Sequence, residues 1–168
     1  MDDQTNSKYS RAPELEDLIF LCRSLNEADA KYILIGGFAV ILHGFVRGTK
    51  DIDLLVDPAE ENIKKIKKAM SRLPDNAISL IEDNEVQKYS VIRIADEFVV
   101  DLLGKACSVD YNNAIKEVEY KELQGVRIPI PKKEKLIEMK DTIRPHDKTD
   151  TQFLKTRIEE EKKLKLQK

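Results

Sequence analysis

The chain has 168 residues, of which 41% are hydrophobic and 36% are charged, and its formal net charge is −2. That length allows one domain with a real core, and the small negative charge excludes a global electrostatic attraction to nucleic acid. Cys22 and Cys107 are too few for a disulfide framework or a cysteine-based zinc site, and two histidines without a paired spacing argue against a zinc enzyme.

The N-terminal stretch is polar and acidic and contains no apolar signal segment. No apolar run approaches the ~18 residues of a membrane span, so we expect a cytoplasmic protein without membrane contacts. Residues 1–12 are expected to be disordered, and residues 13–168 to form a single domain with C-terminal helices within 132–166. Pro13 and the acidic residues after it open a first helix, whose apolar stripe extends to Leu25.

A strand followed by a glycine turn comes next. Residues 33–35 are apolar and β-favouring, and they end at Gly36 and Gly37. The helical spacing of the following apolar residues places the two glycines where a strand meets a helix N-terminus. Backbone N–H groups there can approach an anionic ligand closely.

The second strand, over residues 51–56, carries two aspartates. Because side chains alternate across a strand, Asp51 and Asp53 share one face while the apolar residues share the other. Two such carboxylates beside a phosphate-binding turn can hold a divalent metal over a polyphosphate. A pair of solvated aspartates on a half-buried strand is the alternative interpretation.

Residues 89–103 are predicted to form a hairpin with its turn at Asp96 and Glu97. Asp101 is embedded in the apolar returning strand. A buried, unpaired carboxylate is costly, so this aspartate needs a partner, a metal or a sheet edge. The remaining predicted elements are a helix from residue 58 to the proline at 74, a short helix over 76–81 with a strand as the alternative, a helix over 110–116, a hairpin over 118–123 and 126–130, and helices over 132–143 and 147–166.

The two glycines, the short helix and the run Arg-Gly-Thr-Lys-Asp-Ile-Asp-Leu over residues 47–54 resemble the nucleotidyltransferase superfamily that includes DNA polymerase β. The chain is most similar to the small bacterial branch that includes the toxins of toxin–antitoxin pairs. This resemblance implies an α+β fold with a mixed, mostly antiparallel sheet flanked by helices. One departure is that much of the superfamily has Gly-Ser where this chain has Gly36-Gly37, which leaves only backbone donors there.

The resemblance also implies a reaction. A nucleoside monophosphate would move from a nucleoside triphosphate such as ATP to a hydroxyl acceptor, with release of pyrophosphate. Asp51 and Asp53 would bind Mg²⁺, or Mn²⁺ in its place, and Asp101 would supply the third metal-site carboxylate.

Phosphate binding is expected to use the backbone of Gly36 and Gly37, with Arg47 and Lys140 offsetting negative charge. For Arg47, a place in a solvated loop is an equal alternative. The superfamily resemblance also places aspartates at the start of the last helix, where this chain has Asp147 and Asp150. Asp147 as a simple helix cap is the alternative there.

Two further questions stay open at the level of sequence. The acceptor could be RNA, a protein hydroxyl or a small molecule, and an RNA partner would have to meet a local basic patch. The chain could instead be a non-catalytic nucleotide-binding or antitoxin-like partner protein that retains the fold. The complete set of Asp51, Asp53 and Asp101 favours the enzyme.

Overall fold

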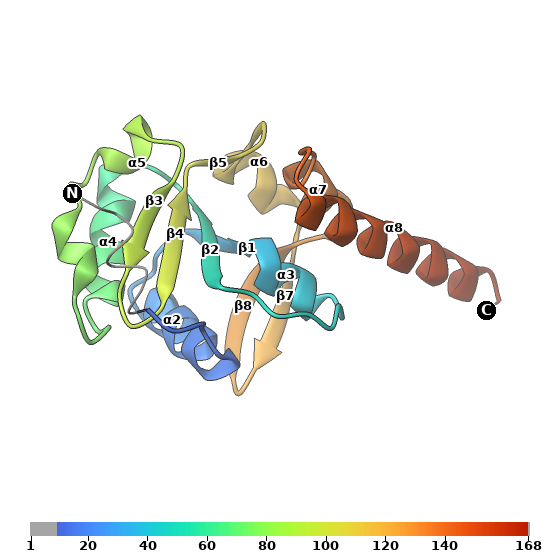
Figure 1. Ribbon diagram of the computed structural model, residues 1–168, viewed down its shortest axis with the longest axis horizontal. Helices are drawn as coiled ribbons and strands as arrows, with labels where there is room; N and C mark the ends of the chain where they lie inside the picture. The colour runs from blue at the N-terminus through green and yellow to red at the C-terminus, as the bar shows by residue number, and fades with distance from the viewer. Residues whose placement is uncertain (1–9, 168) are drawn as a thin grey trace.

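The computed structural model describes residues 10–167, and it is built around one mixed four-stranded sheet (Figure 1). The strand order is β1 (Tyr32–Ile35), β2 (Asp51–Val56), β4 (Val99–Leu103) and β3 (Ile92–Ala95). β2 and β4 run parallel, while β1 pairs with β2 and β3 pairs with β4 in antiparallel fashion. The predicted α+β fold with a mixed, mostly antiparallel sheet is therefore confirmed.

Helices and short strands surround this sheet. They are α2 (Leu15–Glu27), α3 (Gly36–Leu42), α4 (Glu60–Met70), η1 (Ala77–Leu80), α5 (Glu85–Lys88), β5 (Lys105–Ala106), β6 (Val109–Asp110), α6 (Tyr111–Ala114), η2 (Ile115–Glu117), β7 (Val118–Leu123), β8 (Val126–Pro131), α7 (Lys133–Met139) and α8 (Pro145–Leu166). Helix α2 packs against α4, α7 packs against α8, and the β7–β8 hairpin lies beside β1. α8 extends away from the sheet toward the C-terminus (Figure 1).

The core follows from the apolar periodicities of the sequence. All four residues of β1 are buried, as expected for a strand covered on both faces. Along β2, Ile52, Leu54 and Val56 are buried, whereas Asp51 and Asp53 on the other face are only partly covered. This alternation leaves one face of β2 free to present carboxylates.

Some predicted boundaries are corrected by the structure. The first strand of the 89–103 hairpin begins at Ile92 rather than residue 89, because a short helix precedes it. The helix predicted over 132–143 already ends at Met139. The last helix begins at Pro145 rather than residue 147, because proline fits the first helical turn. The strands β5 and β6 were not predicted.

The described chain also begins before the expected domain boundary. The Arg11 N–H donates to the Glu97 carbonyl at 2.9 Å, and the Arg11 guanidinium pairs with Asp17 at 2.6 Å. These contacts hold the segment against the β3–β4 turn. Residues 1–9 of the segment predicted to be disordered lie outside the described residues. Among residues 10–167, every helix is too short or too charged to cross a bilayer.

Candidate functional site

Three carboxylates meet on one face of the central sheet. Asp51 and Asp53 project from the same side of β2, and Asp53 lies directly opposite Asp101 on the parallel strand β4. One carboxylate oxygen from each of the three residues lies within 4.8 Å of the others. The structure therefore brings together the three aspartates singled out from the sequence, and their role as metal ligands stays a prediction.

The electrostatics of this triad indicate a shortage of positive charge. Burial raises the pKa of Asp53 to about 7, and the neighbouring carboxylates of Asp51 and Asp101 add to the shift. Burial also raises the pKa of Asp51, with Asp101 as the second cause. Like charges held this close disfavour full ionisation until a cation joins them. Clustered oxygen donors fit a hard divalent cation such as Mg²⁺.

Arg93 is a residue of the site that the sequence analysis missed. It lies opposite Asp101 in the antiparallel pair of β3 and β4. Its Nε and Nη2 each donate to a different oxygen of Asp101 at 3.0 Å, and Nη2 also reaches Asp51 Oδ2 at 3.3 Å. Alternation along the predicted hairpin was the signal that could have identified it, because Arg93 and Asp101 share one face of the paired strands.

Gly36 allows the chain to turn tightly beneath the triad. Its φ of +68° is a left-handed conformation that favours glycine. A Cβ atom added at Gly36 would overlap the carboxylate of Asp53. The strand-to-helix turn therefore packs directly against one of the three aspartates, and the two glycines open α3 where the sequence predicted that a strand meets a helix.

The space beside Gly37 is filled by two side chains from the following loop. A Cβ atom added at Gly37 would overlap the Arg47 guanidinium and would lie 2.6 Å from Thr49 Oγ1. A serine in place of Gly37 would therefore displace Arg47 or Thr49. The departure from the Gly-Ser pattern is accompanied by a different donor set at the same place, namely a guanidinium and a threonine hydroxyl.

Lys140 belongs to a buried ionic network that links the C-terminal helices to this turn. Its Nζ lies 2.9 Å from Asp150 Oδ2 and 3.6 Å from Asp147 Oδ1. On the other side, Asp150 Oδ1 lies 3.4 Å from Arg47 Nε. Arg47 Nη1 is buried and has no hydrogen-bond partner among residues 10–167. Arg47 is thus partly covered rather than solvated, with a free donor close to Gly37.

Asp147 and Asp150 both face this network. Asp147 lies in the first turn of α8 but is not its N-cap, which is Arg144. Asp147 Oδ2 instead accepts hydrogen bonds from Thr142 and Arg144. The alternative that Asp147 serves as a simple helix cap is therefore wrong. The positive charge of Lys140 partly opposes the rise in the pKa of Asp53 that burial and the neighbouring carboxylates cause.

A similar solved structure is that of a Thermotoga maritima protein, TM1012, which is described as a candidate nucleotidyltransferase. The two chains have 16% sequence identity and a TM-score of 0.49, over 90% of this chain and 89% of that one. No curated protein matches the chain significantly. Residues 14–162 match the model of a family described as nucleotidyltransferase of unknown function, DUF6036. The chain therefore belongs to this nucleotidyltransferase family.

Proposed function

We propose that the protein is a metal-dependent nucleotidyltransferase that moves a nucleoside monophosphate from a nucleoside triphosphate to a hydroxyl acceptor. The observation that carries this proposal is the convergence of the Asp51, Asp53 and Asp101 carboxylates beside the turn at Gly36. A glycine turn and a carboxylate cluster in contact are what a metal-bound polyphosphate requires. Membership of the family supports the same reaction class.

The three aspartates would hold Mg²⁺, with Mn²⁺ as an alternative. The bound metal supplies charge neutralisation for the triphosphate and for the oxygens of an in-line displacement. Because burial and the two neighbouring carboxylates raise the pKa of Asp53 to about 7, its ionisation is a step that a bound cation would assist.

Asp101 is the residue that we assign to the acceptor. The acceptor oxygen attacks the α-phosphorus, and the bond from that phosphorus to the bridging oxygen of the β-phosphate breaks. Pyrophosphate leaves, and the acceptor proton passes to the carboxylate of Asp101 or to a water that it orients. Arg93 holds both oxygens of Asp101, so Asp101 must exchange this contact before it can serve the acceptor.

Phosphate contacts would come from the glycine turn and from Arg47. The backbone N–H groups of Gly36 and Gly37 would donate to the phosphates, and Arg47 Nη1 beside Gly37, which has no hydrogen-bond partner among residues 10–167, would supply a charged donor. Lys140 would act on the phosphates through its charge alone, because its ammonium group is already held by Asp150 and Asp147.

A second candidate is a non-catalytic nucleotide-binding protein that acts through a partner, as an antitoxin does. The observation that favours it is Arg93, whose guanidinium already neutralises Asp101 and reaches Asp51. A guanidinium in that place could permanently replace a metal ion. The enzyme requires Arg93 to leave Asp101 when metal is added, whereas the non-catalytic protein does not.

The test is consumption of labelled nucleoside triphosphates in the presence of Mg²⁺ or Mn²⁺. Each triphosphate is offered with RNA, with protein and with small-molecule hydroxyl acceptors, and pyrophosphate release is measured. We expect transfer by the native chain and none by Asp51→Asn. Asp75→Asn is the matched control, because Asp75 is exposed and far along the chain from the triad.

A binding measurement separates the enzyme from the non-catalytic candidate when no acceptor is found. Metal and triphosphate together should raise the melting temperature more than either alone, because the triphosphate joins the metal to the glycine turn. Triphosphate binding that does not depend on added metal, without turnover of any acceptor, would favour the non-catalytic protein, in which Arg93 takes the place of the metal ion. No shift with either ligand would contradict both.

A further inference from the structure

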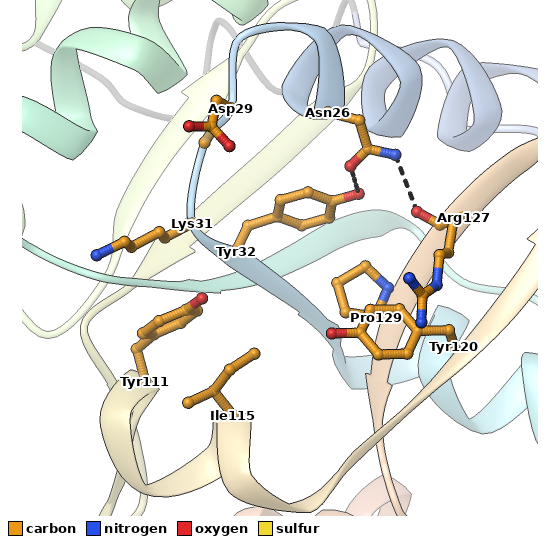
Figure 2. A pocket seen from close by; sticks show the side chains of 10 residues that line it. Asn26, Asp29, Lys31, Tyr32, Tyr111, Ile115, Tyr120, Arg127 and Pro129 are labelled. Atoms are coloured by element: carbon orange, nitrogen blue, oxygen red, sulfur yellow. Dashed lines mark hydrogen bonds between the residues drawn. The ribbon is translucent and has the colours of Figure 1, made fainter.

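A pocket lies at the end of β1 that is opposite to the glycine turn (Figure 2). It has a volume of about 310 Å³ and is open to solvent. Its walls come from three separate segments: the loop between α2 and β1, the α6–η2 turn, and the β7–β8 hairpin. None of its lining residues belongs to the carboxylate triad or to the Lys140 network. The pocket is therefore a distinct feature of the molecule.

Three tyrosine rings contribute to the wall. Tyr111 and Tyr120 stand on opposite sides of the opening, and Tyr32 lies between them at the back (Figure 2). Tyr32 is 3% exposed, and its hydroxyl donates to Asn26 Oδ1 at 2.8 Å. The Asn26 amide in turn donates to the Arg127 carbonyl at 2.9 Å. These hydrogen bonds join two of the three segments and therefore hold the back wall of the pocket in place.

The front of the pocket carries a cationic side chain. The Arg127 guanidinium lies over the Tyr120 ring, 3.8 Å from its centroid, and the residue is exposed. Within residues 10–167 the Arg127 side chain makes no hydrogen bond or ion pair, although Glu122 is its register partner across the hairpin. A guanidinium that stacks on a ring without such partners keeps N–H groups available for an anionic ligand.

A second cation lies on the other side of the opening. Lys31 Nζ is 3.8 Å from Asp57 Oδ2, and its side chain is 61% exposed. Aromatic side chains in the wall favour a ligand with a planar ring that can stack on them. The Arg127 guanidinium favours a ligand that also carries an anionic group. The volume lies at the lower end of the range for ligand pockets, which suits one such unit rather than a dinucleotide.

We infer that this pocket binds one nucleotide, with the base between Tyr111 and Tyr120 and the phosphate on Arg127. The nucleotide can be a free monophosphate or one residue of a single-stranded RNA, since both present a base and a phosphate at the same spacing. Burial, with Tyr120 and Asp57 nearby, raises the pKa of Tyr111, so its phenol stays a neutral donor toward the ligand.

This site does not depend on the proposed transfer reaction. Tyr32 and Ile35 are the two ends of β1, so at ~3.3 Å per residue the pocket and the glycine turn are separated by at least about 10 Å along the strand. Nucleotide binding at the pocket needs no metal, whereas binding to a metal-loaded triad does. Titration in the presence of EDTA therefore removes the metal-dependent binding at the triad, and the Asp53→Asn variant checks for metal-independent binding there.

The experiment titrates the full chain in EDTA with AMP, with a short single-stranded oligoadenylate and with ribose 5-phosphate, by calorimetry. We expect AMP and the oligonucleotide to bind and ribose 5-phosphate to bind at least about tenfold more weakly, because it cannot stack. An oligonucleotide that binds about tenfold tighter than AMP, with an affinity that falls as salt is added, identifies RNA as the source. Equal affinities identify the free nucleotide.

Two substitutions test the residues, each with a matched control. Tyr120→Leu and Arg127→Gln should each weaken binding by about tenfold or more, through the loss of stacking and of a charge-assisted hydrogen bond. Tyr89→Leu and Arg23→Gln change exposed residues outside the pocket and should leave the affinity within about twofold of the native value. Melting temperatures confirm that all four variants are folded.

Four results would overturn the inference. These are no binding of AMP or oligonucleotide in EDTA, unchanged binding in both Tyr120→Leu and Arg127→Gln, ribose 5-phosphate binding as well as AMP, or loss of EDTA-resistant binding in Asp53→Asn. The last result would assign the nucleotide to the carboxylate triad instead.

Discussion

Arg93 and Asp101 form a two-point ion pair across β3 and β4, with both N–H···O distances at 3.0 Å. The Asp101 side chain is 7% exposed, whereas that of Arg93 is 56% exposed. The carboxylate is therefore fixed by the sheet, while the guanidinium can move into solvent. A divalent cation that binds the triad competes with this guanidinium for the same carboxylate oxygens.

Replacing Arg93 with methionine should strengthen metal binding and weaken the metal-free fold. Without the guanidinium, the triad has more uncompensated negative charge, so the affinity for Mn²⁺ should rise by about tenfold or more. The metal-free protein should lose about 1–3 kcal/mol, because Asp101 is left buried without its partner. Calorimetric titration with Mn²⁺ and urea denaturation measure the two effects, with Arg23→Met as the control. Unchanged Mn²⁺ affinity would show that Arg93 does not compete with the metal.

Substitution of Asp53 by asparagine should abolish transfer and metal binding without loss of stability. Burial and two neighbouring carboxylates raise the pKa of Asp53 to about 7, so its charge opposes folding at higher pH. A shift of one pKa unit corresponds to about 1.4 kcal/mol. We therefore expect the free energy of unfolding of Asp53→Asn to exceed that of the native chain by at least this amount at about pH 8 without metal. Denaturation curves beside an activity assay measure both effects, and Asp75→Asn is the control. A large loss of stability would instead identify Asp53 as a structural carboxylate.

The same raised pKa predicts how stability depends on pH. The folded-state pKa of Asp53 is about 7 and its ordinary value is 3.8, so between these values the folded state binds more protons than the unfolded state. The free energy of unfolding should therefore fall as the pH rises from about 4 to about 8. Millimolar Mg²⁺ favours the ionised form and should flatten this slope. Urea denaturation at several pH values, with and without Mg²⁺, measures it; an identical slope in Asp53→Asn would exclude Asp53 as its cause.

Gly36→Ala tests the contact between the turn and the triad. Gly125 is the matched control, because it also has a positive φ but has no atom within 4 Å of an added Cβ. Both alanine variants should lose about 1–2 kcal/mol through backbone strain. Only Gly36→Ala should also lose affinity for Mn²⁺, since its methyl group pushes the Asp53 carboxylate away. Equal Mn²⁺ affinity in the two variants would contradict this role of Gly36.

The carboxylate site was predictable because its signals are local. Period-two alternation placed Asp51 and Asp53 on one face of β2, and Asp101 was conspicuous as the charged residue of an apolar strand. The strand-to-helix turn was equally readable from Gly36 and Gly37. These features depend on short-range geometry, which the chain encodes within a few residues. The placement of Asp101 beside the other two aspartates came instead from the superfamily resemblance, because β2 and β4 are distant in the chain.

The features that were missed depend on register and on tertiary assembly. The pairing of Arg93 with Asp101 requires the register of β3 and β4, and a shift of one residue would place the two side chains on opposite faces. Lys140 falls within the helix predicted over 132–143, but it caps α7, and its partners come from the next helix. No local pattern specifies how α7 and α8 pack on each other.

The Arg93–Asp101 pair also has a consequence for the order in which the chain folds. These two residues are only 8 positions apart, so the β3–β4 hairpin can form with its own counter-charge early. Asp53 and Asp101 are distant in the chain, and their strands must close a long loop before they pair. We therefore expect Arg93 to neutralise Asp101 before β4 pairs with β2. We expect the two carboxylates to meet during folding without the electrostatic barrier that a bare Asp101 would bring.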